Sequence, residues 1–223
     1  MDITQLILDD HHEQRRLFAI LEQVDRTDTA TLRAVWGRLA AFLELHAAAE
    51  EEIFYPALLR VGIQARRGGI AEDETLDAIG DHNEIRDAVM SVPGHPAGSD
   101  DWFAGVAAAN QANSDHMGEE EREGLTDFRR LASLQLRHDL GVAWVRYEAE
   151  HYAGVRPVDK DPAGYIREEE QRQGLPSGGQ PDQRPPDQGP PDQGPPGQRQ
   201  PDQGPPDGPA AAGSLSIGSL RTP

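Results

Sequence analysis

Two short segments place a histidine four residues before a glutamate: His46-Ala47-Ala48-Ala49-Glu50 and His116-Met117-Gly118-Glu119-Glu120. Residues four apart lie on one face of an α-helix, so each pair can hold one metal ion or two neighbouring ions. Each pair also continues an inward stripe of its helix, formed by Leu39, Leu43 and Phe54 in the first and by Val106, Ala109 and Asn113 in the second. Because an unpaired carboxylate in a protein core is costly, a bound metal ion would explain both pairs.

Two further helices each offer one inward histidine. His11 lies four residues after Ile7 and therefore on the apolar face, whereas its neighbour His12 lies on the polar face. His82 follows Ile79 at helical spacing and is inward by the same reasoning. These two histidines are the remaining nitrogen ligands that the sequence predicts.

The pattern occurs twice along the chain. His82 follows His11 by 71 residues, and the second His/Glu pair follows the first by 70 residues. The repeat predicts a pseudo-twofold bundle whose two ligand sets meet at its axis, where two metal ions bridged by two carboxylates would fit. The predicted ligands are His11, His46, Glu50, His82, His116 and Glu120.

Apolar residues at helical spacing predict the elements that position these ligands. Helices are expected over residues 3–26, 30–61, 73–91 and from after Ser99 to at least 131, with Asp2 and Ser99 as N-caps and a loop around 67–69. Four helices joined by short to moderate loops predict an all-α fold, an up-and-down antiparallel four-helix bundle. An additional C-terminal helix over 134–153 is expected to pack outside it.

Proline marks the domain boundary. Only Pro56, Pro93 and Pro96 precede residue 157, whereas a Pro-Asp-Gln-Gly-Pro cycle with a period of five residues begins near residue 176. The sequence therefore predicts a helical domain over 1–155 and a disordered, low-complexity Pro/Gln/Gly-rich tail over 156–223. An inert solubilising tail is favoured over a partner-binding one, and no tail partner can be named.

Composition excludes several classes of function. The formal net charge of −18 argues against a nucleic-acid partner, because phosphate binding needs clustered lysine and arginine. The absence of cysteine excludes disulfides, iron–sulfur clusters, thiolate zinc sites and cysteine nucleophiles. Neither a leader nor a stretch long and apolar enough for a membrane span is found, which predicts a soluble cytoplasmic protein with no membrane partner.

Three segments resemble the motifs of the hemerythrin HHE cation-binding family. They are residues 8–13 (LDDHHE), residues 42–56 with the HxxxEE…FYP element, and residues 81–86 (DHNEIR). The resemblance covers roughly residues 3–150 and looks closest to actinobacterial hemerythrin-like proteins, some of which are linked to hydrogen peroxide handling. It implies a helical bundle with two non-haem iron ions, and activities that range from O2 carriage and sensing to peroxide breakdown.

The sequence also departs from the oxygen carriers of that family. Their third helix reads His-x-x-x-His and their fourth reads His-x-x-x-x-Asp, whereas here Arg86 stands four residues after His82. Glu120 and Glu121 stand four and five residues after His116, so either could bridge, and the internal match with Glu50 favours Glu120. The fifth histidine is missing.

Without a fifth histidine, the predicted metal site has open coordination positions. Four imidazoles and two bridging carboxylates fill about eight of about twelve octahedral positions, which leaves roughly four for water, O2 or peroxide. We therefore favour reaction with O2 or hydrogen peroxide, including catalase-like breakdown in an oxidative-stress response, over reversible O2 storage. The alternative is a non-enzymatic O2-binding, iron-binding or redox-sensing module. Tyr55 follows the ligands of the second helix and is expected to be a core residue.

Two rival metal sites are not supported. A ferritin-like oxidase needs Glu-x-x-His on each of two helices, and only Glu148 and His151 match it, outside the four-helix bundle. A zinc hydrolase of the His-Glu-x-x-His kind would need a second histidine after His12-Glu13, where the chain has arginine. The histidines left without a partner pattern, expected to be structural or exposed, are His95, His138 and His151.

Overall fold

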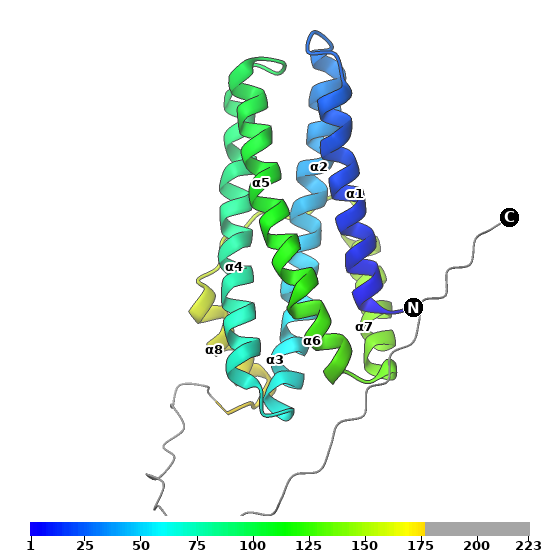
Figure 1. Cartoon of the computed structure of the whole chain (residues 1–223), viewed down its shortest axis with the longest axis vertical. Coiled ribbons are helices and arrows are strands. Elements are labelled where there is room, and N and C mark those ends of the chain that lie inside the picture. The colour runs from blue at the N-terminus through cyan, green and yellow to red at the C-terminus, as the bar shows by residue number, and fades with distance from the viewer. Residues whose placement is uncertain (177–223) are drawn as a thin grey trace, which may run out of the picture. The chain divides into compact units, whose positions relative to one another are not determined.

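The computed structural model describes residues 1–176, which are helical with no strand in that range (Figure 1). The elements are α1 (Ile3–Gln23), α2 (Thr29–Ala49), the π-helical turn η1 (Glu50–Phe54), α3 (Tyr55–Gln64), α4 (Gly68–Ser91), the 3-10 turn η2 (Val92–Gly94), α5 (Asp100–Arg122), α6 (Gly124–Leu131), α7 (Leu134–Glu150) and α8 (Pro162–Gln173). The all-α prediction is confirmed. The disorder expected from residue 177 onward lies outside the described residues.

The four long helices form the bundle. Helix α1 runs beside α2 and α4 beside α5, and contacts of α1 with α5 and of α2 with α4 close the ring (Figure 1). Side chains of Asp2 and Ser99 accept hydrogen bonds from the backbone N–H groups of Thr4 and Trp102, which confirms both predicted N-caps. Helix α7 packs on α1 and α2 from outside, as expected of the additional helix.

Both helices that carry a His-x-x-x-Glu pair are interrupted close to the glutamate, at Glu50 in the first and after Arg122 in the second. The helix expected over 30–61 contains the η1 turn, in which the Tyr55 N–H donates to the carbonyl of Glu50, five residues earlier. Pro56 explains this wider turn, because proline cannot donate a backbone hydrogen bond and clashes with the carbonyl four residues before it. The helix expected to reach residue 131 is likewise divided between α5 and α6. Helix α4 begins at Gly68, earlier than expected.

Helix α8 is a feature that the sequence did not predict. It lies inside the segment that was expected to be a disordered tail, and it packs on α4 and α3 with Tyr165 and Ile166 buried. Asp161 caps its N-terminus by accepting from the N–H of Gly164, and Gly174, at φ +63°, ends it. The ordered helical part therefore continues beyond the predicted boundary at residue 155.

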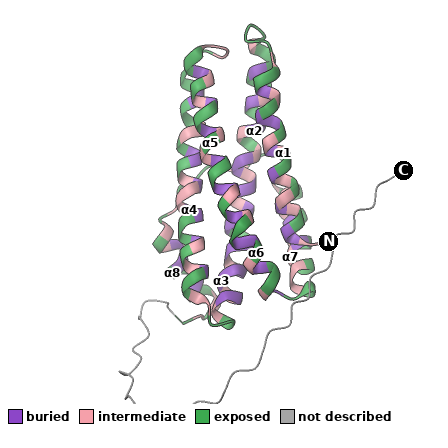
Figure 2. Cartoon of the chain, in the orientation of Figure 1, coloured by how far each residue is buried: buried purple, intermediate pink, exposed green. Residues whose placement is uncertain are grey.

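The apolar core consists of two clusters with a polar layer between them. One cluster surrounds Trp36 and Trp102 near the α1–α2 loop, and the other surrounds Phe54, Phe128 and Trp144 near α3 and α6. Figure 2 shows buried residues along the inward faces of the helices at both levels. No helix within residues 1–176 is sufficiently long and apolar to cross a membrane.

The loop before α5 requires glycine at position 98. Gly98 has φ +86°, and a Cβ there would collide with the carbonyl oxygen of Arg26. We expect Gly98→Ala to lower the free energy of unfolding by about 1–3 kcal/mol, measured by urea denaturation. The control Gly37→Ala, in the middle of α2 with no atom within 4 Å of the added Cβ, should raise it by about 0.5–1 kcal/mol. Equal effects of the two changes would contradict this account.

Candidate metal centre

The polar layer contains all six residues that the sequence predicted as ligands. Helices α1, α2, α4 and α5 each contribute one histidine, η1 contributes Glu50, and α5 also contributes Glu120. Every one of these side chains is buried, and Glu50 and His11 have no exposed surface. Six ionisable groups at the centre of an apolar bundle need a common explanation.

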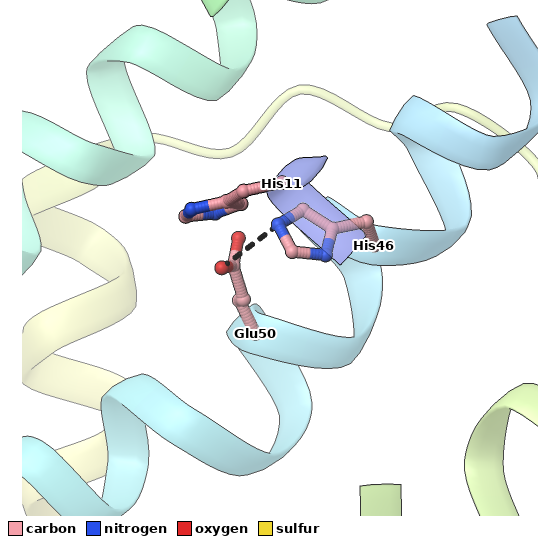
Figure 3. Close-up of side chains that lie close together, drawn as sticks. All are labelled: His11, His46 and Glu50. Atoms are coloured by element: carbon pink, nitrogen blue, oxygen red, sulfur yellow. Dashed lines mark ion pairs between the residues drawn. The ribbon is translucent and has the colours of Figure 1, made fainter. Parts of the chain in front are cut away.

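Glu50 lies at the centre of this layer. Its Oε1 is 3.0 Å from Nε2 of His46, and its Oε2 is 3.2 Å from Nε2 of His82 and 4.0 Å from Nε2 of His116. Glu50 therefore belongs to two groups whose ligand atoms lie within 4.8 Å of one another, one with His11 and His46 and one with His82 and His116. Figure 3 shows the first group converging. A carboxylate shared in this way suits two cations rather than one.

Glu120 lies beside His11 in the polar layer. Its Oε2 lies 3.4 Å from Nε2 of His11, while its Oε1 accepts a hydrogen bond of 2.8 Å from the Tyr55 hydroxyl. Tyr55 is a core residue, as expected, but its hydroxyl also fixes one oxygen of Glu120. Glu120 thus offers one free oxygen, whereas Glu50 offers two.

The atoms left without a hydrogen-bond partner support a cation site. They include Nε2 of His11 and His46, both carboxylate oxygens of Glu50, and Oε2 of Glu120. Buried polar atoms in folded proteins are almost always satisfied, and these five face one another at the centre of the bundle. Imidazole nitrogen and carboxylate oxygen are the donors that iron, manganese and zinc accept, so the residues fit a metal ion.

Each histidine is oriented by a second carboxylate on its Nδ1 atom. The Nδ1-to-oxygen distances are 2.9 Å for His11–Glu121, 3.1 Å for His46–Asp10, 2.8 Å for His82–Glu51 and 3.4 Å for His116–Asp81. Such partners fix the tautomer and the ring orientation of ligating histidines. All four Nε2 atoms are thereby directed to the centre, and Glu121 is occupied as a partner of His11.

Arginines support these outer carboxylates. Arg15 donates to Glu121 at 2.8 Å, and Arg86 donates to Glu51 at 2.8 Å and to Glu44 at 2.9 Å. Arg86, which stands where the oxygen carriers have a fifth histidine, is therefore directed away from the centre.

Sequence reasoning missed this outer shell, although its signal was present. Asp10 and Asp81 each precede a ligand histidine, Glu51 and Glu121 each follow a ligand glutamate, and Arg15 and Arg86 each stand four residues after a histidine. These pairs repeat with the same spacing of 70 or 71 residues as the ligands themselves. The internal repeat therefore extends beyond the ligands.

The carboxylates shift the pKa values of the imidazoles in the protein without metal. Burial alone would lower the pKa of His82, but the adjacent carboxylates of Glu50 and Glu51 outweigh it and raise the pKa to about 9. The pKa of His46 is likewise raised well above its usual range, against burial, by Glu50 and Asp10. The hydrogen bond to His11 and the charge of Arg15 lower the pKa of Glu121 to about 2, against burial. Protons therefore provide the positive charge when no metal is bound.

Comparison with known families agrees with this geometry. A family model described as the hemerythrin HHE cation-binding domain matches residues 2–128, more than half of the chain, and this range holds all six central residues. Searches of curated proteins and of solved structures gave no match.

Metal binding should depend strongly on pH, because the cation must displace protons from the imidazoles. His82 is protonated below about pH 9, so the apparent affinity should rise with pH by about tenfold per unit for each proton displaced. We would titrate the metal-free protein with Co2+ between pH 6 and 8 against a competing chelator. The exposed-residue variant His12→Ala should show the same slope. An affinity that does not change over this range would contradict the assignment.

Proposed function

The chain belongs to the hemerythrin HHE cation-binding family, and on this premise we propose that it holds two non-haem iron ions and reacts with O2 or hydrogen peroxide. The observation that carries the proposal is the position of Glu50, whose two oxygens face separate pairs of histidines. One ion would be held by His11 and His46 and the other by His82 and His116, with Glu50 between them. Glu120 would add its free oxygen.

Two iron ions would supply one-electron changes between the ferrous and ferric states, together with open coordination positions. The chain itself supplies the rigid surroundings. The outer carboxylates hold the four imidazoles in place, and the two apolar clusters pack on either side of the layer along the bundle. This arrangement preorganises the site before any ligand arrives.

Tyr55 holds a proton beside the proposed site. It is almost fully buried, and burial together with the negative charges of Glu120 and Glu50 raises its pKa well above the usual range. The phenol therefore stays protonated at neutral pH and donates to Glu120. A proton at this atom can be shared with the carboxylate when the charge of the centre changes.

The missing fifth histidine favours reaction over storage. Arg86 is committed to Glu44 and Glu51 and cannot ligate, so the ion near His82 retains open positions. An open, buried centre of this kind suits peroxide breakdown as part of an oxidative-stress response. A reversible O2-binding or redox-sensing module is the alternative outcome of the experiment.

The ligand assignment makes a prediction about iron content. Aerobically purified, iron-loaded protein should contain about two irons per chain, the number that two cation groups imply, and show oxo-bridged absorption. His82→Ala and Glu120→Ala should each lower the iron content, whereas the exposed His12→Ala should not. Glu121→Gln should still reach full loading at high iron concentration, with affinity weakened about 10- to 100-fold. Zinc alone, or equal loss in His82→Ala and His12→Ala, would disprove the assignment.

The proposed reaction can be separated from simple binding by measuring turnover. We expect the iron-loaded protein to release O2 steadily from hydrogen peroxide in an oxygen-electrode assay, at a rate above that of free iron. Glu50→Ala, which removes the shared carboxylate, should reduce this rate to the level of free iron. A stable, reversible O2 spectrum without turnover would instead favour the binding module.

A further inference from the structure

A cavity of about 210 Å³ opens beside one half of the proposed site. It lies between α2, α4 and α5, and His46, His82 and His116 form its floor. Its walls are mainly aliphatic, with Leu43, Ala47 and Val89 among them. An apolar cavity of about 150 Å³ is already large enough to bind benzene, so this volume far exceeds what O2 or hydrogen peroxide requires.

The internal repeat shows that the cavity depends on particular small side chains. The position that matches Ala47 in the other half of the chain holds Met117, and the position that matches Val89 holds Phe18. Met117 and Phe18 are both buried, and each is larger than the residue that it matches. The cavity is therefore a property of one half of the pseudo-twofold bundle and does not follow from the ligand geometry.

The polar groups in the cavity wall are already paired. Arg86 directs its donors to Glu44, Glu51 and Asn83, and the Asn113 amide donates to Gln14. A ligand in this cavity would thus meet aliphatic carbon along its length and polar atoms chiefly at the histidine floor. This pattern suits a molecule with an apolar body and one polar end.

The connection between α7 and α8 covers the cavity. Val155 and Pro157 contribute to its wall, and the connection passes behind the long helices in Figure 1. Its far end is fastened to α4 because the Asn83 amide donates to the carbonyl of Lys160 at 2.8 Å and accepts from the Lys160 N–H at 3.1 Å. Lys160 also pairs with Glu51 at 2.8 Å. The cover is therefore anchored to a residue that orients His82.

We propose that this cavity binds a small organic hydroperoxide, with its apolar body against Leu43, Ala47 and Val89 and its polar end at the histidine floor. The inference rests on the proposed function, because it names a substrate class for the same site. Apolar contact remote from the reacting end supplies binding energy that hydrogen peroxide cannot obtain. The cavity therefore selects organic peroxides by size and polarity.

Binding can be tested without any redox chemistry. We would load the protein with diamagnetic Zn2+ and titrate it with 2-phenyl-2-propanol, the stable alcohol of cumene hydroperoxide, while recording methyl NMR spectra. Shifts should be confined to the methyl groups around the cavity, with a dissociation constant on the order of 1 mM or below. Val89→Phe, which introduces the residue found at the matching position, should weaken binding at least tenfold. Val142→Phe, the same change at an exposed site on α7, should have no effect.

A second measurement uses the iron-loaded protein. With ascorbate as the electron donor, cumene hydroperoxide should be reduced to 2-phenyl-2-propanol and water while ascorbate is oxidised to dehydroascorbate. The rate of this reduction, relative to that of hydrogen peroxide with the same donor, should fall at least tenfold in Val89→Phe and stay constant in Val142→Phe. Absence of cavity shifts, or equal behaviour of the two variants, would overturn the inference. If the alcohol binds but the iron-loaded protein consumes no peroxide, the proposed function fails and the ligand class of the cavity stands.

Discussion

The structure depends on one buried carboxylate. Glu50 has no exposed surface, and neither of its oxygens accepts a hydrogen bond. Such a group is tolerated in an apolar core only beside positive charge, which here comes from protonated imidazoles or from bound cations. Because four helices each bring one imidazole to this position, the burial of Glu50 constrains which residues these helices can place around it.

Outward from Glu50, successive layers of side chains alternate between positive and negative charge. The imidazoles around Glu50 are themselves backed by acidic side chains such as Glu51 and Glu121, and these are backed by Arg86 and Arg15. Each layer reduces the cost of burying the layer inside it. Loss of a single outer group should therefore alter the centre even though that group touches no proposed ligand atom.

Periodicity alone was sufficient to predict the bundle and to bring the six central residues together, because inward position follows from spacing along a helix. Spacing could not separate Glu120 from Glu121, since neighbouring residues point in different directions that depend on local backbone geometry. The contacts of Glu121 with His11 and Arg15, and of Glu120 with Tyr55, favour Glu120 at the centre. The η1 turn was not predicted because Pro56 overrides the helical periodicity there. Helix α8 was not predicted because Pro157 and Pro162 obscure the periodicity of the segment that contains it.

The two halves of the chain share their inner chemistry but differ in their packing. On the side of His11, Tyr55 fixes Glu120, while the position that matches Tyr55 holds the apolar Leu125. On the side of His82, small residues leave a cavity where Met117 and Phe18 close the other half. Duplication therefore explains how the two similar groups of candidate ligands arise, and the later divergence of packing residues explains why the two groups are not equivalent. In the proposed centre, His11 faces a Glu120 that Tyr55 fixes, whereas His82 and His116 line the cavity together with His46, so we expect the proposed chemistry to begin on the cavity side.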